Sequence, residues 1–272
     1  MQRRLVCWRR KRMNDQWLIL FTLVFARVGG LVMTAPIFGA GAVPARVRVL
    51  LAAALTLLVV PVLWQGPAAR IDGPAQYFVL LGGEAIVGAC LGLGILVLVH
   101  GMTMAGAVIS HASGLSIAET FDPVLEENVP QFSRLLFLLA VCVFFLLGGH
   151  RAAMAGLLDT FRTIPPGSGA LPGSLAEGFS TLAGQSFSLG IRAAAPALTA
   201  LLLATLILGL IGRTLPQLNV LALGFGLNSL LAFAALAVTL GVVTWAFADQ
   251  IAPALETILD ALKTPLRSEW LS

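Results

Sequence analysis

Long apolar stretches alternate with short runs of proline, glycine and charged residues along nearly the whole chain. A helix needs about 20 largely apolar residues to cross a bilayer, and it satisfies its own backbone hydrogen bonds in lipid. The pattern therefore predicts six apolar helical segments. They cover approximately residues 17–36, 46–64, 75–110, 132–149, 190–212 and 218–247, and the fifth has a more polar lead-in from Ser174. The third is long enough for more than one span's worth of helix.

Clusters of proline and glycine separate these segments at 61–74, 123–130 and 165–173. The last cluster reads PPGSGALPG and is the clearest boundary in the chain. Beyond Asp249 the apolar content falls, but Leu255, Ile258, Leu259 and Leu262 keep helical spacing. This spacing predicts an amphipathic terminal helix. No internal repeat of 20–50 residues is visible.

The composition excludes several classes of protein. Apolar residues make up 58% of the 272 residues, charged residues only 11%, and the mean hydropathy is +0.93. A soluble globular protein carries about a quarter charged residues. Too little charge is present to coat a water-soluble particle or to sustain disorder, and three cysteines do not make a disulfide scaffold. The sequence thus predicts an all-α membrane-associated protein, or one subunit of a mostly buried assembly.

Basic residues are concentrated at the start of the chain, where six fall within the first twelve positions. The rest of the chain offers no basic face to continue this run, so we expect no nucleic acid partner. Anionic lipid headgroups are the expected partner instead. The run also resembles the start of a signal peptide, but the apolar stretch that follows lacks a small-x-small cleavage site. We therefore expect this segment to be retained.

Two ionisable residues, Arg27 and Glu84, lie inside predicted apolar helices. An ionisable group facing lipid costs several kcal/mol, so both should face protein or a water-filled path. With a cytoplasmic N-terminus, Arg46 and Arg48 fall on the side that the positive-inside rule disfavours. Either several segments are not ordinary lipid-facing spans, or the polar groups line an interior.

Candidate chemistry is scarce. The chain has no HExxH, GxxxxGK[ST] or GxSxG motif, so we expect no enzymatic activity. His100 and His111 would share a face of one helix about 16 Å apart, which is too far for one metal ion. The three cysteines form no CxxC motif. We therefore expect neither a metal nor a cofactor.

The stretch at about 112–131 is the most unusual in the chain. It includes GLSIAETFDPVLEENVPQ, which mixes acids, prolines and apolar residues between two strongly apolar segments. One interpretation is a solvated surface loop. The other is a loop inserted into a passage, because irregular backbone at membrane depth is tolerated only inside protein or beside water.

An ordered set of short motifs runs through nearly the whole chain. The set comprises Arg27-Val28, TAPIF at 34–38 with Pro36, Val43-Pro44, Arg46-Val47-Arg48, Gly114-Leu115-Ser116-Ile117-Ala118, Asp122-Pro123, Gly149-His150, Asp159-Thr160-Phe161, Ile164-Pro165, Gly167, Leu208-Gly209-Leu210, Pro216-Gln217-Leu218-Asn219 and Gly224-Phe225. In this order the motifs resemble the FliR family of flagellar type III secretion export-gate proteins. The virulence counterpart of that family is the T subunit of injectisomes.

The resemblance implies a noncatalytic subunit of a helical hetero-oligomer in the bacterial inner membrane, within the flagellar basal body. Its partners would be FliP-like and FliQ-like subunits, FlhA/FlhB-type export components, membrane lipid and unfolded export substrates. Residues 1–170 would form a FliP-like region of bent helical hairpins, and 174–272 a FliQ-like hairpin with the terminal helix. The loop at 112–131 would contribute a plug to the channel.

We accordingly expect the plug to involve Gly114, Leu115, Ser116, Ile117, Ala118, Asp122 and Pro123. Structural or intra-assembly contacts are expected of Arg27, Pro36, Pro44, Arg46, Glu84, Pro216 and Gln217. Two other hypotheses remain open. One is a stand-alone secondary transporter of a small solute that uses Arg27, Glu84 and Arg192. The other is a membrane scaffold in which the loop is merely solvated. The motifs resemble the flagellar proteins more closely than the T subunits of virulence injectisomes, so we favour a role in the flagellum.

Overall fold

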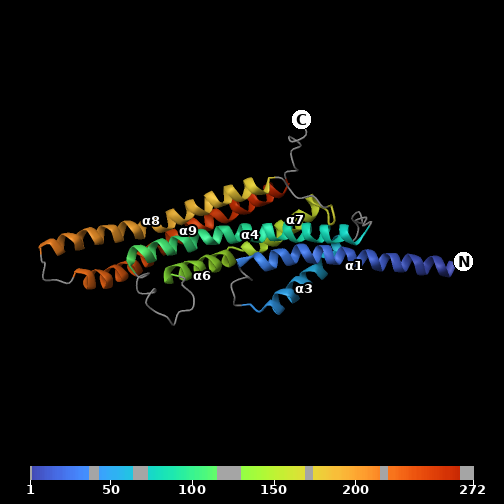
Figure 1. Cartoon of the computed structure of the whole chain (residues 1–272), viewed down its shortest axis with the longest axis horizontal. Coiled ribbons are helices and arrows are strands. Elements are labelled where there is room, and N and C mark those ends of the chain that lie inside the picture. The colour runs from blue at the N-terminus through green and yellow to red at the C-terminus, as the bar shows by residue number, and fades with distance from the viewer. Residues whose placement is uncertain are drawn as a thin grey trace, which may run out of the picture. The chain divides into compact units, whose positions relative to one another are not determined.

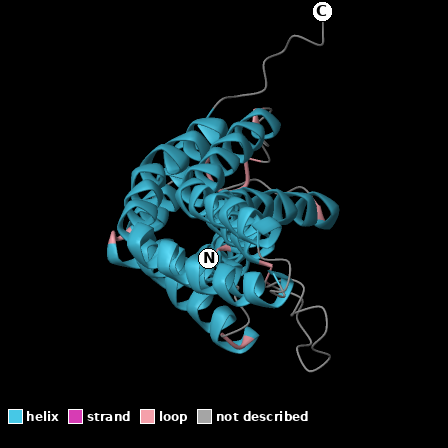
Figure 2. Cartoon of the chain, turned by 90° about the vertical axis from the view of Figure 1, so that its left-hand side faces the viewer, coloured by secondary structure: helices cyan, strands magenta, loops and turns pink. Residues whose placement is uncertain are grey.

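The computed structural model describes residues 2–36, 43–63, 73–114, 130–168, 174–214 and 220–263, with side chains from Gln16 onward except at 220–223, 225 and 239. Within these ranges helices are the only regular secondary structure (Figure 2). The helices are α1 (Gln2–Thr34), α3 (Ala45–Leu63), α4 (Pro74–Ser113), α6 (Gln131–Leu146), α7 (Gly149–Thr163), α8 (Leu175–Thr214) and α9 (Val220–Lys263). Four are long and apolar enough to cross a membrane, or up to six if two bent pairs count as one span each. The prediction of an all-α membrane protein is confirmed.

Several helices differ in length from the apolar segments. The third segment is one unbroken helix of 40 residues, and α8 and α9 have 40 and 44 residues. The residues after Asp249 are helical but continue α9 instead of forming a separate helix. Helix α7 corresponds to no predicted segment, because its sequence GHRAAMAGLLDTFRT is amphipathic and carries three charged residues. A search for uniformly apolar runs does not detect such a helix.

A sharp bend of 68° joins α6 to α7. Gly148 has a φ of 74°, which is costly for any residue with a Cβ atom. The amides of Leu147 and Gly148 donate to the carbonyls of Val143 and Phe145, at 3.0 Å each, and so close the last turn of α6. A left-handed glycine and these two hydrogen bonds therefore end α6 at the break before α7.

The chain divides into two compact units. Unit 1 comprises Met1–Leu96, His150–Thr181 and Ala254–Ser272, and unit 2 comprises Val97–Gly149 and Leu182–Pro253. Each unit thus combines segments from both sides of the PPGSGALPG boundary. The division of the sequence into 1–170 and 174–272 describes order along the chain and stays a prediction.

In unit 1, α1 and the first half of α4 run parallel in close contact. The Tyr77 hydroxyl donates to Thr22 Oγ1 at 2.8 Å, and Thr34 Oγ1 donates to the Ala89 carbonyl at 3.2 Å, so residue numbers rise together along both helices. Between these contacts, a Cβ atom at Gly88 would overlap the Arg27 carbonyl. Helix α3 turns back against α1 (Figure 1). Glycine on α4 is therefore what allows the two backbones to touch.

In unit 2, the second half of α4 is contacted by α6 and α8. Ser133 Oγ on α6 donates to the Thr103 carbonyl at 3.0 Å, and Ser186 Oγ on α8 donates to the Val97 carbonyl at 2.6 Å. A Cβ atom at Gly106 would overlap the Phe132 backbone. Small residues and hydroxyls allow these helices to approach closely, as is typical of membrane helices, and large apolar side chains such as Met102, Phe132 and Leu189 are buried between them.

Helices α8 and α9 lie side by side as an antiparallel hairpin (Figure 1). In unit 1, Ser174 Oγ donates to the Ala261 carbonyl at 2.7 Å. In unit 2, Gly224 lies against the side chain of Leu208. Large apolar side chains nevertheless stay exposed along this hairpin, among them Leu202, Leu203, Leu206, Leu210, Leu230, Val238 and Trp245. Such surface requires lipid or another protein to cover it.

Candidate functional site

The largest fully buried side chain in the described part of the chain is a charged one, Arg27 on α1. Its exposed fraction is 0%, and its Nε donates to Oε2 of Glu84 on α4 at 2.6 Å. Glu84 is itself only 4% exposed. Two opposite charges from two parallel helices therefore neutralise one another inside unit 1, away from lipid.

The other nitrogens of Arg27 bind α7 and the residue after it. Nη1 donates to Thr160 Oγ1 at 3.2 Å, and Nη2 donates to the Ile164 carbonyl at 3.0 Å. The Phe161 ring lies 4.4 Å from the guanidinium carbon, as in a cation–π contact. The Ile164 carbonyl follows directly on α7, so the cation also lies at the negative end of that helix dipole.

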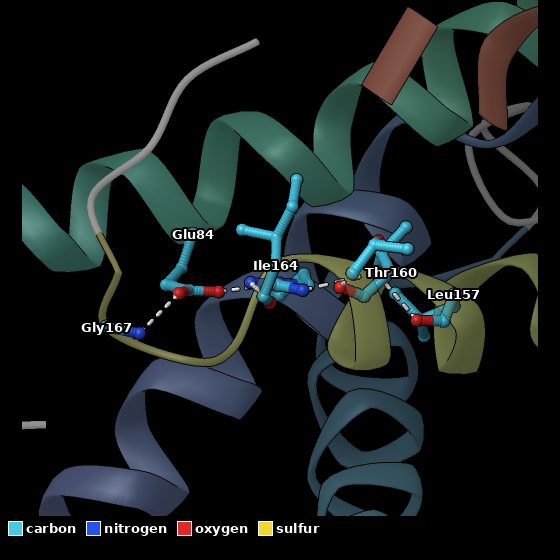
Figure 3. Close-up of polar contacts among 7 residues, drawn as sticks. Glu84, Leu157, Thr160, Ile164 and Gly167 are labelled. Carbon is cyan, nitrogen blue, oxygen red and sulfur yellow. Dashed lines mark hydrogen bonds and ion pairs between the residues drawn. The ribbon is translucent and has the colours of Figure 1, made fainter. Parts of the chain in front are cut away.

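The second oxygen of Glu84 holds the turn that follows α7. The Gly167 amide donates to Oε1 of Glu84 at 2.8 Å (Figure 3). Gly167 has a φ of 82°, in the left-handed region that favours glycine. The Ser168 amide donates to the Pro165 carbonyl at 3.1 Å and closes the turn. Glu84 thus connects α1 on one side to the turn on the other.

We call the group Arg27, Glu84, Thr160, Phe161, Ile164 and Gly167 the Arg27 cluster. It joins α1, α4 and α7 by charge-assisted hydrogen bonds, which are roughly twice as strong as neutral ones. Both Glu84 oxygens and all three Arg27 nitrogens are engaged by the chain itself. The Arg27 cluster therefore cross-links three helices, and its charged groups leave no open position for a ligand. Among the described residues, no group of three or more His, Cys, Asp or Glu side chains is placed to hold a metal ion.

The other predicted site residues lie elsewhere. Pro36 is buried just beyond α1, and the Pro44 carbonyl accepts from the Val47 amide at 2.9 Å at the start of α3. Arg46 is exposed in the first turn of α3. Gly114, with a φ of 79°, ends α4 and donates to the His111 carbonyl. Leu115, Ser116, Ile117, Ala118, Asp122, Pro123, Pro216 and Gln217 lie outside the described residues.

Sequence reasoning alone did not identify Thr160, Phe161, Ile164 or Gly167 as partners of Arg27. The available signal was the motif series itself, because Arg27-Val28, Asp159-Thr160-Phe161, Ile164-Pro165 and Gly167 all belong to it. At this cluster the motif Arg27-Val28 meets three motifs that lie together at 159–167, more than 130 residues further along the chain. The contact between these motifs could not be predicted from the sequence, because no spacing rule links α1 to α7.

Comparisons with known proteins place the chain among bacterial export proteins. The profile of the family described as "Bacterial export proteins, family 1" matches residues 18–254. The chain is 29% identical over 246 residues to the flagellar biosynthetic protein FliR of Bacillus subtilis strain 168, covering 89% of this chain and 94% of that protein. It is 32% identical over 219 residues to FliR of Escherichia coli K12, covering 79% and 83%. The secretion system apparatus protein SsaT of Salmonella typhimurium is 27% identical over 226 residues, covering 80% and 85%.

Proposed function

The chain belongs to the bacterial export proteins of family 1, and on that premise we propose that it is a noncatalytic subunit of the flagellar type III protein export gate. Membership of this family implies work alongside other export components. Relatives named FliR match over most of their length at 29% and 32% identity, which is the observation that carries the flagellar assignment. The match to SsaT at 27% identity supports the second candidate, a T subunit of a virulence injectisome.

Helix length supports an assembly over a protein that works alone. Helices α4 and α8 have 40 residues each, while α9 has 44 residues but bends by 55° between Val238 and Leu240. An α-helix rises about 1.5 Å per residue, so α4 and α8 are each about 60 Å long, while the hydrocarbon layer is about 30 Å thick. A helix of this length that crosses the bilayer leaves about half of itself outside the lipid, and its exposed leucines there need other protein chains to cover them.

The Arg27 cluster is a reason to set the transporter hypothesis aside. A secondary transporter uses intramembrane ionisable groups to bind its substrate or coupling ion. Arg27 and Glu84 are instead buried against each other and engaged by Thr160, Ile164 and Gly167. We propose that they fasten the helices of the subunit while partner chains complete the channel.

The finer assignments rest on the resemblance to the FliR family. Residues 1–170 would be the FliP-like region and 174–272 the FliQ-like region, packed with FliP-like and FliQ-like subunits in the inner membrane at the flagellar basal body. FlhA/FlhB-type export components and unfolded export substrates would be further partners. The loop from Gly114 to Pro123, within 112–131, would plug the channel at rest. Its acids and prolines between two apolar segments support this role.

Purification of the assembly tests the proposal. The full chain, carrying a C-terminal tag, would be expressed in its own cells, extracted in mild detergent and weighed by native mass spectrometry. We expect one copy with several FliP-like and FliQ-like chains, and loss of filament-protein secretion when the gene is deleted. A lone monomer that binds or moves a small solute would overturn the export assignment. Secretion of virulence effectors in place of filament protein would select the injectisome candidate.

A further inference from the structure

Two exposed arginines bound a stretch of α8 that carries no charge. Arg192 and Arg213 are both exposed, and no acidic or basic residue lies between them. They are 21 residues apart, which at about 1.5 Å per residue is about 31 Å along the helix. The hydrocarbon layer of a bilayer is about 30 Å thick. The uncharged stretch of α8 therefore has the length of one bilayer core.

Large aliphatic side chains cover the exposed side of this stretch. The part of α9 beside it, from Val220 to the residue before Asp249, also carries no charge. Six aliphatic side chains there are each at least 61% exposed, namely Leu202, Leu203, Leu206 and Leu210 on α8 and Leu230 and Val238 on α9. We call the surface that these six residues form the aliphatic surface, and all of it belongs to unit 2.

The threonine hydroxyls near the aliphatic surface bond back to their own helices. The Oγ1 atoms of Thr199 and Thr205 each donate at 2.8 Å to a carbonyl of α8, and Thr244 Oγ1 donates at 2.8 Å to a carbonyl of α9. At a contact between helices of this chain the geometry differs, since Ser186 Oγ donates across to the Val97 carbonyl. Contacts between membrane helices use hydroxyls that reach across in this way. The three threonines need no polar partner outside the chain.

An exposed tryptophan on α9 lies near the level of Arg192. Trp245 is 70% exposed. The two helices are antiparallel, and Gly224 lies against the side chain of Leu208 (Figure 1). Counted from that contact at about 1.5 Å per residue, Arg192 is about 24 Å away along α8 and Trp245 at most about 32 Å away along the bent α9, in the same direction. Tryptophan is enriched where membrane meets water, and arginine side chains reach toward that interface.

We infer that a lipid bilayer covers the aliphatic surface, and that its headgroup phosphates bind Arg192 on one side and Arg213 on the other. The guanidinium group suits phosphate in both charge and geometry. The nearest acids along the two helices, Glu177 and Asp249, are exposed beyond the level of Arg192, where water surrounds them. Residues 175–191 of α8 then lie outside the hydrocarbon. The inference goes beyond the export function, because it holds whatever the complex transports.

Nitroxide labels on single cysteines test this position of the bilayer. In a chain with its three native cysteines replaced by alanine, labels would be attached at Ala195→Cys, Leu203→Cys and Leu210→Cys, and at Ser180→Cys outside the aliphatic surface. All four positions are exposed. The assembled complex would be purified into nanodiscs of phosphatidylcholine and phosphatidylglycerol. Electron paramagnetic resonance then measures how often each label collides with oxygen, which enters hydrocarbon, and with a water-soluble nickel chelate, which does not.

We expect the ratio of oxygen to nickel collisions to be highest at Leu203→Cys and lower at both Ala195→Cys and Leu210→Cys. Leu203 is about 15 Å or slightly more from each arginine along α8, so it lies at the middle of the hydrocarbon. Its ratio should exceed that of Ser180→Cys roughly tenfold or more, because polar solutes are excluded from hydrocarbon. Leu230→Cys on α9, which lies at the same level, should give a similarly high ratio and guards against a misfolded Leu203 variant.

Three results would overturn the inference. Rare collisions with both reagents at Leu203→Cys and Leu230→Cys would show that another protein chain covers the surface. Frequent nickel collisions at these two positions would show that water does. A ratio that changes in one direction from Ala195→Cys to Leu210→Cys would place the bilayer elsewhere. Filament-protein secretion by the cysteine-free parent is measured separately, so failure of the export assignment is distinguished from failure of the lipid assignment.

Discussion

Glu84 on α4 and Gly167 beyond α7 are joined by a hydrogen bond of 2.8 Å, although 83 residues separate them in sequence. The same carboxylate accepts from Arg27 on α1. A single buried acid therefore connects two helices and the turn that leads out of a third. Substitutions at this point test whether the Arg27 cluster holds unit 1 together.

Replacement of Glu84 by leucine should destabilise the chain strongly. Arg27 would stay buried without its counter-charge, and breaking a buried ion pair from one side costs about 3–5 kcal/mol. We expect a much lower yield of assembled complex and a lower midpoint of thermal unfolding in detergent. Normal assembly and motility with Glu84→Leu would show that the charge is dispensable.

The double variant Arg27→Met with Glu84→Leu is the matched control for that loss. Because it removes both charges, no unpaired ion is left in the interior, and such replacements are often close to neutral. We expect it to recover more than half of the stability lost in Glu84→Leu. If the single and double variants are equally unstable, the Arg27 cluster stabilises the chain through the packing of its side chains and not through their charges.

Gly167→Ala should weaken the turn held by Glu84. With a φ of 82°, this position costs a residue with a Cβ atom about 1–2 kcal/mol. Asparagine tolerates the left-handed region better, so Gly167→Asn should cost less than Gly167→Ala. Gly184→Ala in α8 is the control, because open space surrounds that position and alanine favours the helix. Thermal unfolding would rank the three, and a neutral Gly167→Ala contradicts the geometry.

Gly88→Ala should separate α1 from α4. The added methyl group would overlap the Arg27 carbonyl, and forcing extra volume into a packed interface costs about 1–3 kcal/mol. Gly83→Ala, on the same helix but facing open space, should instead be neutral or stabilising by up to about 1 kcal/mol. Each variant adds one methyl group to the parent chain, so only the surroundings of that group differ. A stability loss of equal size in both would exclude close packing as the cause.

Deletion of 115–121 tests the proposed plug. If the loop closes the channel at rest, cells with the deletion should admit a small membrane-impermeant dye while the complex still assembles. Glu126→Gln with Glu127→Gln, which changes charge but keeps the loop length, should leave the membrane tight. Unchanged permeability together with intact secretion in the deletion variant would remove the plug role.

The uniformly apolar helices were predictable because membrane helices need a continuous run of apolar residues. Helix α4 illustrates this, since one unbroken apolar stretch became one unbroken helix. The exceptions have a common cause. Helix α7 is half polar, and the lead-in to α8 is polar as well, so neither resembles a span. Contacts with other segments cover the apolar side of α7, where Gly156 lies against the side chain of Leu259.

The candidate site was predictable in part. Charges within apolar helices singled out Arg27 and Glu84, because lipid does not tolerate them. Their pairing with each other and with α7 did not follow from spacing, since 57 residues separate the two and 133 separate Arg27 from Thr160. Gly167 belongs to the motif series, but it has no charge or periodicity that could pair it with Glu84. Its left-handed φ and its hydrogen bond to Glu84 are seen only in the structure.

The sequence by itself determined that this protein associates with a membrane, that it is helical and which family it belongs to. Composition, local periodicity and ordered motifs are properties of the chain alone. Tertiary structure decided which polar groups meet. A buried charge must find a partner, but the partner is chosen by how helices pack, through glycine contacts such as Gly88 with Arg27. That packing brings distant segments together, so that Arg27 is buried and paired with Glu84 while Arg162 stays exposed.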